Sequence, residues 1–357
     1  MLHLSYQRRA LRFNFPARTS RGALTEHVAY YLRLHDPRRP EVVGWGEAAP
    51  LAGLSPDYQP DFETEIAALC QRINGAGLPE LTPEQAAALV PAHLPSLRFA
   101  LETAALDLAG GGQHQLYHNE FSRGRAGLPI NGLVWMGDAA FMREQIRQKL
   151  AAGYSCLKLK IGSLDFDTEL ALLTEIRAEA GPDRLVLRVD ANGAFAPAEA
   201  LGKLGRLACF DLHSIEQPIA AGQWPALAEL CRHSPVPVAL DEELIGLTEP
   251  ARQEALLAAV RPPYLVLKPT LLGGHAATRR WIAMAEANGA GWWITSALES
   301  NVGLNAVAQL TGEYDVAGFA QGLGTGQLYF NNVEAPLSIA GGALHYAPAG
   351  PWADPVG

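Results

Sequence analysis

The segment SCLKLKIG, residues 155–162, has the pattern of a buried β-strand that carries two lysines. Residues two apart in a strand share a face, so Lys158 and Lys160 point one way and their apolar neighbours point the other. Seven further short apolar runs follow or precede it, and amphipathic helical segments separate most of them. They are INGLVWMG (130–137), RLVLRVDANG (184–193), LHSIEQP (212–218), VPVALDEEL (236–244), PYLVLKPTLLGG (263–274), GWWITSALES (291–300) and YDVAGFAQGLGT (314–325). Eight strand–helix units predict a closed parallel (β/α) barrel of the α/β class, with both lysines facing its C-terminal mouth.

The sequence outside these units predicts a second, smaller domain. Residues 1–125 begin with strand-like segments and continue with helical patterns such as PSLRFALETAALDLAG (95–110), which is typical of an α+β domain. We expect residues 126–325 to form the barrel. The proline-rich residues 326–357 cannot continue it and are expected to return to the first domain. A doubly wound sheet is the structural alternative, but INGLVWMGD lacks the glycine fingerprint that follows its first strand.

The composition restricts the class of partner. The 357 residues carry a formal net charge of −9 with 48% hydrophobic residues, and no block of Lys or Arg occurs. Nucleic acid and anionic membranes both reward clustered positive charge, so neither is expected as a partner. No signal-peptide pattern and no apolar run long enough for a membrane span are present, which predicts a cytoplasmic protein. A small-molecule substrate is the expected partner, and the sequence leaves a homo-oligomer open.

Polar residues recur at the end of successive predicted strands. Five of them lie 25 to 30 residues apart, about one strand–helix unit: Lys160, Asp190, Glu216, Asp241 and Lys268. Isolated buried charges are costly, so a common explanation is needed, either a metal site or a metal-free ion-pair network. Three carboxylates without His or Cys form the hard-oxygen set that Mg²⁺ prefers, with Mn²⁺ as a substitute.

This set of groups predicts a type of chemistry. A lysine near a divalent cation and a second lysine loses stability in its charged form, so its pKa falls toward the range of a general base. A substrate carboxylate bound to the cation becomes more acidic at its α-carbon. The pattern therefore predicts removal of a proton α to a carboxylate.

At these residues the chain resembles the enolase superfamily, and in particular its muconate-lactonizing subgroup. Eight segments are similar to those of the o-succinylbenzoate synthase family: INGLVWMG, LKLKIG, RVDANGAF, SIEQP, ALDEELIG, LKPTLLGG, SALESNVGLNAVAQL and GLGTGQLYFNN. The resemblance implies an N-terminal capping domain completed by the C-terminal segment. It also implies Mg²⁺-dependent dehydration of 2-succinyl-6-hydroxycyclohexa-2,4-diene-1-carboxylate to o-succinylbenzoate, a hydro-lyase reaction of menaquinone biosynthesis that passes through a metal-stabilised enediolate.

The resemblance also implies roles for individual residues. Lys160 would be the base, Lys268 would stabilise the enediolate from the other face, and Lys158 would act on Lys160 electrostatically. Asp190, Glu216 and Asp241 would hold the metal, with Asn192 and Glu242 orienting them. The expected substrate contacts are Arg21, in the mobile loop ARTSRGALTEH (17–27), and Ser296, Glu299 and Ser300 at the end of the seventh strand. Glu47, in GWGEAAPL, is expected to be mainly structural.

Two alternatives stay open at this point. Two lysines on opposite faces of a substrate also suit an N-succinylamino acid racemase or a dipeptide epimerase of the same superfamily. A non-catalytic barrel that binds a ligand and keeps the charges as an ion-pair network is the remote alternative.

Overall fold

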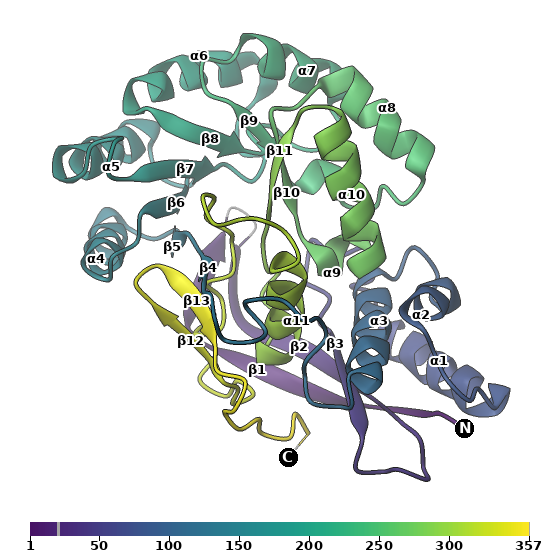
Figure 1. The fold of residues 1–357 in the computed structure, drawn as a ribbon. Coiled ribbons are helices and arrows are strands. Elements are labelled where there is room, and N and C mark those ends of the chain that lie inside the picture. The colour runs from purple at the N-terminus through teal and green to yellow at the C-terminus, as the bar shows by residue number, and fades with distance from the viewer. Residues whose placement is uncertain (20–21, 357) are drawn as a thin grey trace.

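A computed structural model describes residues 1–19 and 22–356 (Figure 1). Its centre is a curled sheet in the order β11-β10-β9-β8-β7-β6-β5, in which every neighbouring pair is parallel. The strands are β5 (Gly132–Val134), β6 (Cys156–Lys160), β7 (Val186–Asp190), β8 (Leu212–Glu216), β9 (Val238–Leu240), β10 (Tyr264–Leu267) and β11 (Gly291–Ile294). The enolase-type parallel sheet expected from the sequence is therefore confirmed for these seven strands.

The predicted eighth strand, within residues 314–325, is the exception. In the described structure this segment joins the sheet through isolated bridges, from Gln321 to Ile130 and from Gly322 to Thr295. The amide of Gly322 donates to the carbonyl of Ile294 at 2.8 Å, so the segment still spans the gap between the two edge strands. A Cβ at Gly322 would collide with the Thr295 side chain, and several further glycines flank it. Glycine weakens a regular strand, which explains why the barrel closes through a few bonds here.

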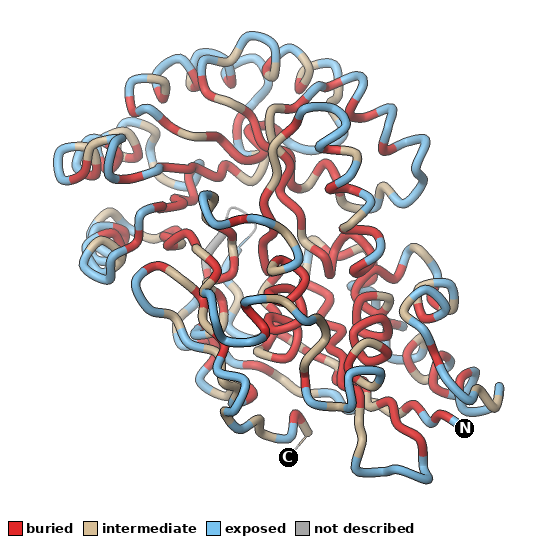
Figure 2. The backbone as a smooth tube through the Cα atoms, in the orientation of Figure 1, coloured by how far each residue is buried: buried red, intermediate tan, exposed pale blue. Residues whose placement is uncertain are grey.

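Helices cover the outside of this sheet (Figure 1). They are α4 (Ala139–Ala151), α5 (Phe166–Glu179), α6 (Pro197–Leu207), α7 (Trp224–His233), α8 (Pro250–Val260), α10 (His275–Ala287) and α11 (Asn301–Thr311). Three short helices lie between these elements: η1 (Ala208–Phe210) after α6, η2 (Glu242–Leu244) after β9 and α9 (Pro269–Leu272) after β10. Figure 2 shows the strands as largely buried and the outer helices as exposed on their solvent side. Leu157 and Leu159 of β6 belong to one apolar core with Leu172 of α5 and Ile146 of α4. The alternation in SCLKLKIG thus separates a helix-facing side from a side that carries the lysines.

The N-terminal region forms an antiparallel sheet backed by helices. Its strands β1 (His3–Thr19), β2 (Gly22–His35) and β3 (Val43–Ala48) pair in that order, and α1 (Phe62–Ala76), α2 (Pro83–Leu89) and α3 (Pro95–Ala109) follow. Gly46 lets β3 approach α3 closely, because a Cβ there would overlap the carbonyl of Ala100. The described residues of segment 17–27, which was predicted to be a mobile loop, form the end of the β1–β2 hairpin, where Ala17 pairs with Leu24. The mobility of this segment and its contact with the substrate stay predictions. Arg21 lies outside the described residues.

Helix α3 is fixed against the barrel helix α10. The Glu102 carboxylate accepts hydrogen bonds from the backbone amides of His275 and of Ala276 at the start of α10. A carboxylate is favourable at a helix N-terminus because unpaired amides and the helix dipole are positive there. The His275 ring lies 2.9 Å from the Thr103 hydroxyl and 3.0 Å from that of Tyr117. Burial lowers the pKa of His275 to about 3.

The last residues return along the chain to its beginning. The amide of Asn14 in β1 donates to the Leu328 carbonyl at 2.8 Å, and the amide of Phe330 donates to the Arg12 carbonyl at 3.2 Å. The hairpin β12 (Leu337–Ala340) and β13 (Ala343–Tyr346) then pairs with β4 (Leu128–Pro129). Residues 328–330 therefore lie beside β1 and the hairpin lies beside β4, while the predicted domain bounds stay a prediction. In the described part of the chain no helix has the length and apolar character needed to cross a membrane.

Candidate active site

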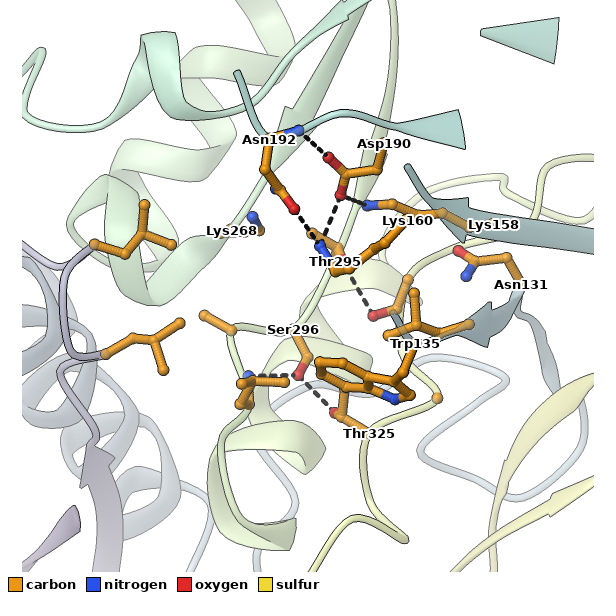
Figure 3. Close-up of a pocket in the computed structure, with 17 residues that line it drawn as sticks. Asn131, Trp135, Lys158, Lys160, Asp190, Asn192, Lys268, Thr295, Ser296 and Thr325 are labelled. Atoms are coloured by element: carbon orange, nitrogen blue, oxygen red, sulfur yellow. Dashed lines mark hydrogen bonds and ion pairs between the residues drawn. The ribbon is translucent and has the colours of Figure 1, made fainter. Parts of the chain in front are cut away.

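A cavity opens at the carboxyl ends of the barrel strands (Figure 3). It measures about 670 Å³, open solvent included. It is lined by Leu51, Leu54, Asn131, Leu133, Trp135, Lys158, Lys160, Asp190, Asn192, Lys268, Thr295, Ser296, Ala297, Leu298, Gly322, Gly324 and Thr325. Three lysines, one carboxylate and three hydroxyls thus face apolar walls, which is typical of a site for a small polar molecule.

The two lysines of β6 lie among carboxylates from the next strands. Lys158 donates to Glu216 at 2.5 Å and forms an ion pair with Asp190 at 2.9 Å. Lys160 lies 3.0 Å from the same Asp190 oxygen and donates to Asn192 at 2.8 Å. Both lysine side chains are buried, at 7% and 9% exposure. The side-chain parity of β6 and the spacing of the strand ends therefore bring together the residues that the sequence predicted.

A second lysine–carboxylate pair lies across the mouth. Asp241 directly follows β9, Lys268 directly follows β10, and the two form a short buried ion pair. Lys160 and Lys268 thus enter the cavity from strands that are four positions apart in the sheet. A molecule bound between them meets an ammonium group on either side.

Burial and mutual charge perturb these groups strongly. Burial lowers the pKa of Lys158, but Asp190, Glu216 and Asp241 outweigh it, and the net pKa is raised. The pKa of Lys268 is raised for the same reasons, with Asp241 as the largest attractive charge. Burial and the neighbouring Asp190 carboxylate raise the pKa of Glu216 to about 8. Three carboxylates crowded at one level repel one another, so additional positive charge would stabilise their ionised forms.

The same carboxylates fit a metal ion in their chemistry. Within residues 1–19 and 22–356, no three His, Cys, Asp or Glu side chains are already gathered around one point that could hold a metal. The reason is that Asp190, Glu216 and Asp241 are each turned toward a lysine ammonium. However, the buried Oε1 of Glu216 has no hydrogen-bond partner among the described residues, as expected for an atom that faces a cation. A set of carboxylate oxygens suits Mg²⁺ or Mn²⁺.

Asn192 connects the lysine side of the site to Glu242. Its backbone amide donates to Asp190 at 3.0 Å, and its side-chain amide donates to Glu242 at 3.0 Å. Asn192 has a φ of 44°, in the left-handed region that asparagine tolerates better than most residues. The turn after β7 therefore holds the Asn192 oxygen toward Lys160.

The three residues predicted after the seventh strand divide into two groups. Ser296 lines the cavity, and its hydroxyl lies 2.6 Å from that of Thr325. Glu299 and Ser300 are fully buried behind the lining. Glu299 accepts a hydrogen bond from Thr270 at 2.6 Å, and Ser300 donates to Glu47 at 2.5 Å. The substrate contact of Glu299 and Ser300 stays a prediction. The hydrogen bonds described here hold the surrounding backbone and side chains in place, in line with the mainly structural role expected for Glu47.

Several lining residues were not predicted. Asn131, Leu133 and Trp135 share one face of INGLVWMG, so the parity argument applied to SCLKLKIG would have found them. Leu51 and Leu54 come from the turn after β3 and have no such signal. They reach the cavity only because the N-terminal sheet packs against the barrel mouth.

This fold and this site define the class. The chain belongs to the enolase superfamily, a superfamily of enzymes, because residues 141–351 match the family described as Enolase C-terminal domain-like. The o-succinylbenzoate synthase of Desulfotalea psychrophila is 47% identical in an alignment that covers 96% of this chain and 98% of that protein. The crystal structure of MenC from Desulfotalea psychrophila LSv54 has a TM-score of 0.84 at 44% identity and covers 96% of this chain and 99% of that one. An N-succinylamino acid racemase from Amycolatopsis is 28% identical over 94% of this chain and 89% of that protein.

Proposed function

We propose that this protein is an o-succinylbenzoate synthase, which converts 2-succinyl-6-hydroxycyclohexa-2,4-diene-1-carboxylate to o-succinylbenzoate and water with Mg²⁺. The observation that carries the proposal is the pair of lysines, Lys160 and Lys268, on opposite sides of a cavity that also presents Asp190. The high identity to a protein of that name over nearly the whole length supports the choice of substrate.

In this proposal Asp190, Glu216 and Asp241 hold the cation. Bound Mg²⁺ would lower the barrier to losing the α-proton by stabilising the negative charge that develops on the substrate carboxylate. Each of these carboxylates now contacts a lysine, so metal binding would also free those ammonium groups.

Each of the three lysines has its own role in this proposal, and Lys160 carries out the proton transfers. The neutral amine of Lys160 takes the proton from the α-carbon, and the resulting ammonium returns it to the departing hydroxyl group, which leaves as water. The ring then becomes aromatic, which makes the step strongly favourable. Lys268 stabilises the negative charge from the other face. Lys158 supplies a nearby positive charge that acts on Lys160 electrostatically.

The apolar walls supply the shape of the site. Leu51 and Leu54 approach from the N-terminal sheet while Trp135 and Leu133 approach from the first barrel strand. These side chains exclude water from the reacting face, which strengthens the electrostatic interactions between the charged groups and the substrate. We therefore propose that residues 1–125 act as a capping domain, residues 126–325 as the catalytic barrel, and residues 326–357 as the segment that completes the cap.

The test follows the cyclohexadiene absorbance with purified protein, with and without EDTA. We expect loss of absorbance that stops when the metal is chelated and resumes when excess Mg²⁺ is added. The matched control is Lys203→Met, which removes an outer-helix lysine that pairs with Glu199 and leaves the cavity unchanged. An absence of metal-dependent turnover in the unaltered protein would overturn the proposal.

Racemisation of N-succinylamino acids is the second candidate. The lysines on both sides of the cavity favour it, because two-sided proton transfer needs a base and an acid facing each other. Incorporation of deuterium at the α-carbon of N-succinylamino acids in D₂O detects this activity separately from dehydration.

A further inference from the structure

A second cavity adjoins the catalytic one at the weakly closed side of the barrel. It measures about 870 Å³, open solvent included. It is lined by Phe15, Asn131, Leu133, Trp135, Phe141, Gln145, Gln148, Lys149, Tyr154, Gly324, Thr325, Gln327 and Leu328. Five of these residues also line the catalytic cavity, so the two spaces share a wall: Asn131, Leu133, Trp135, Gly324 and Thr325. We call this second space the side cavity.

The side cavity exists because the predicted eighth strand is irregular. Backbone hydrogen bonds join Gln321 to Pro129 and Asn131, just before β5, and join Gly322 to the other edge of the sheet at Ile294. Beyond that point Gly324 and Thr325 lie in a turn. Gly324 and Thr325 lie at the junction, because they line both cavities together with Asn131, Leu133 and Trp135. A chain-like group that extends from the catalytic cavity would enter the side cavity along these shared lining residues.

Asn131 occupies the junction with an unsatisfied side chain. The residue is 5% exposed, and its Oδ1 has no hydrogen-bond partner among the described residues. A buried polar atom without a partner costs about 1–3 kcal/mol. A carboxylate only accepts hydrogen bonds, so Asn131 would donate to such a ligand from its Nδ2 after rotation of the amide.

Lys149, in the last turn of α4, lines the side cavity. Its aliphatic stem packs over Gly132, with Cβ and Cδ each 3.2 Å from where a Cβ would stand. Its Nζ lies 4.9 Å from the centre of the Tyr154 ring. No carboxylate forms an ion pair with it in the part of the chain that the structure describes, whereas the three lysines of the catalytic cavity are all paired. Burial lowers the pKa of Lys149, as expected for an ammonium without a compensating anion.

We propose that the side cavity binds the distal carboxylate of the substrate's succinyl arm, with Lys149 as its cation and Asn131 as the amide at the junction. The proposal rests on the proposed function, which supplies a substrate with two carboxylates. One carboxylate belongs at the metal end, where Lys158, Lys160 and Lys268 already neutralise acidic groups. The other requires a separate positive charge, and Lys149 is the cationic side chain available to it among the described lining residues.

The test measures binding to the Mg²⁺-loaded protein by calorimetry, without turnover. The ligands are o-succinylbenzoate and 2-butanoylbenzoate, in which a methyl group replaces the distal carboxylate. We expect Lys149→Met, which preserves the stem over Gly132, to weaken o-succinylbenzoate binding about tenfold and to leave 2-butanoylbenzoate binding unchanged. Lys149→Arg should retain most of the affinity, and Lys203→Met should match the unaltered protein.

Two outcomes would overturn the proposal. One is equal binding of o-succinylbenzoate by Lys149→Met and the unaltered protein, and the other is an equal loss for both ligands. Arg21→Met is measured in parallel, and a selective loss there in place of Lys149→Met would assign the distal carboxylate to Arg21. A protein that binds both ligands but does not dehydrate the substrate would refute the proposed function. The comparison of o-succinylbenzoate and 2-butanoylbenzoate binding would still test the role of Lys149.

Discussion

A substitution of Ser300 tests whether this residue stabilises the fold or contacts the substrate. Its hydroxyl donates to the buried Glu47 carboxylate at 2.5 Å and accepts from the amide of Val302 at 3.2 Å, which caps α11. Loss of a hydrogen bond to a charged group costs about 1.5–3 kcal/mol. Loss of a helix N-cap costs about 0.5–2 kcal/mol. We therefore expect Ser300→Ala to lower the free energy of unfolding by about 2–4 kcal/mol, because the two contributions overlap in part.

The measurement is urea unfolding combined with steady-state kinetics. Burial raises the pKa of Glu47 to about 7, so unfolding is followed at pH 8, where this carboxylate is ionised. The Michaelis constant of Ser300→Ala should stay within about twofold of the unaltered protein, since its side chain does not line the cavity. Glu47→Gln combined with Ser300→Ala should cost less than the sum of the single changes, because they remove the same bond.

Ser296→Ala is the matched comparison. Ser296 lies four residues earlier, lines the cavity and has Thr325 as its hydroxyl partner. We expect this variant to raise the Michaelis constant with an unfolding penalty of only about 1 kcal/mol. The reasoning is refuted if Ser300→Ala shifts the Michaelis constant while its unfolding free energy changes by less than about 0.5 kcal/mol.

Three further predictions concern the catalytic lysines, the metal and a buried histidine. Lys160→Ala and Lys268→Ala should each lower kcat/KM by roughly a thousandfold or more with an unchanged far-UV circular dichroism spectrum, and near-normal turnover in either would remove that lysine from the chemistry. Mg²⁺ should raise the thermal unfolding midpoint of the unaltered protein, and an equal rise in Asp241→Asn would exclude this carboxylate as a ligand. His275 is neutral in the folded state, with a pKa of about 3, but gains a proton in the unfolded state below pH 6.5. Its contribution to stability is therefore lost on acidification, by about 1.4 kcal/mol per pH unit. The unfolding free energies of the unaltered protein and of His275→Gln should converge as the pH falls, and parallel curves would contradict this.

The sequence predicted that the charged residues of the candidate site lie together, because two simple regularities place them. Side chains alternate along a strand, and parallel strands end at one edge, so Lys160 and Asp190 meet whatever the intervening helix contains. The observed 3.0 Å contact between them follows from this geometry. The presence of the same regularities in INGLVWMG would have indicated Asn131 and Trp135 as well.

Other features depend on contacts that no local pattern contains. Leu51 and Leu54 reach the cavity because the N-terminal sheet packs against the barrel mouth, and no pattern in the turn after β3 indicates this contact. The segment 314–325 has the composition of a strand. In the described structure, however, it joins the sheet through isolated bridges, and one of them pairs Gly322 with Thr295, directly after β11. The sequence did not indicate whether the side chains of Glu299 and Ser300 face a ligand or the interior, because the backbone conformation of the turn after β11 decides their direction.

Leu51 and Leu54 separate the shape of the cavity from its charged groups. The lysines and carboxylates lie at the ends of barrel strands, whereas the two leucines belong to a turn about a hundred residues before Lys160. We expect a substitution in that turn to change which molecules fit the cavity without moving any lysine or carboxylate. Exchange of this short turn between relatives should then change substrate preference while the charged groups stay in place.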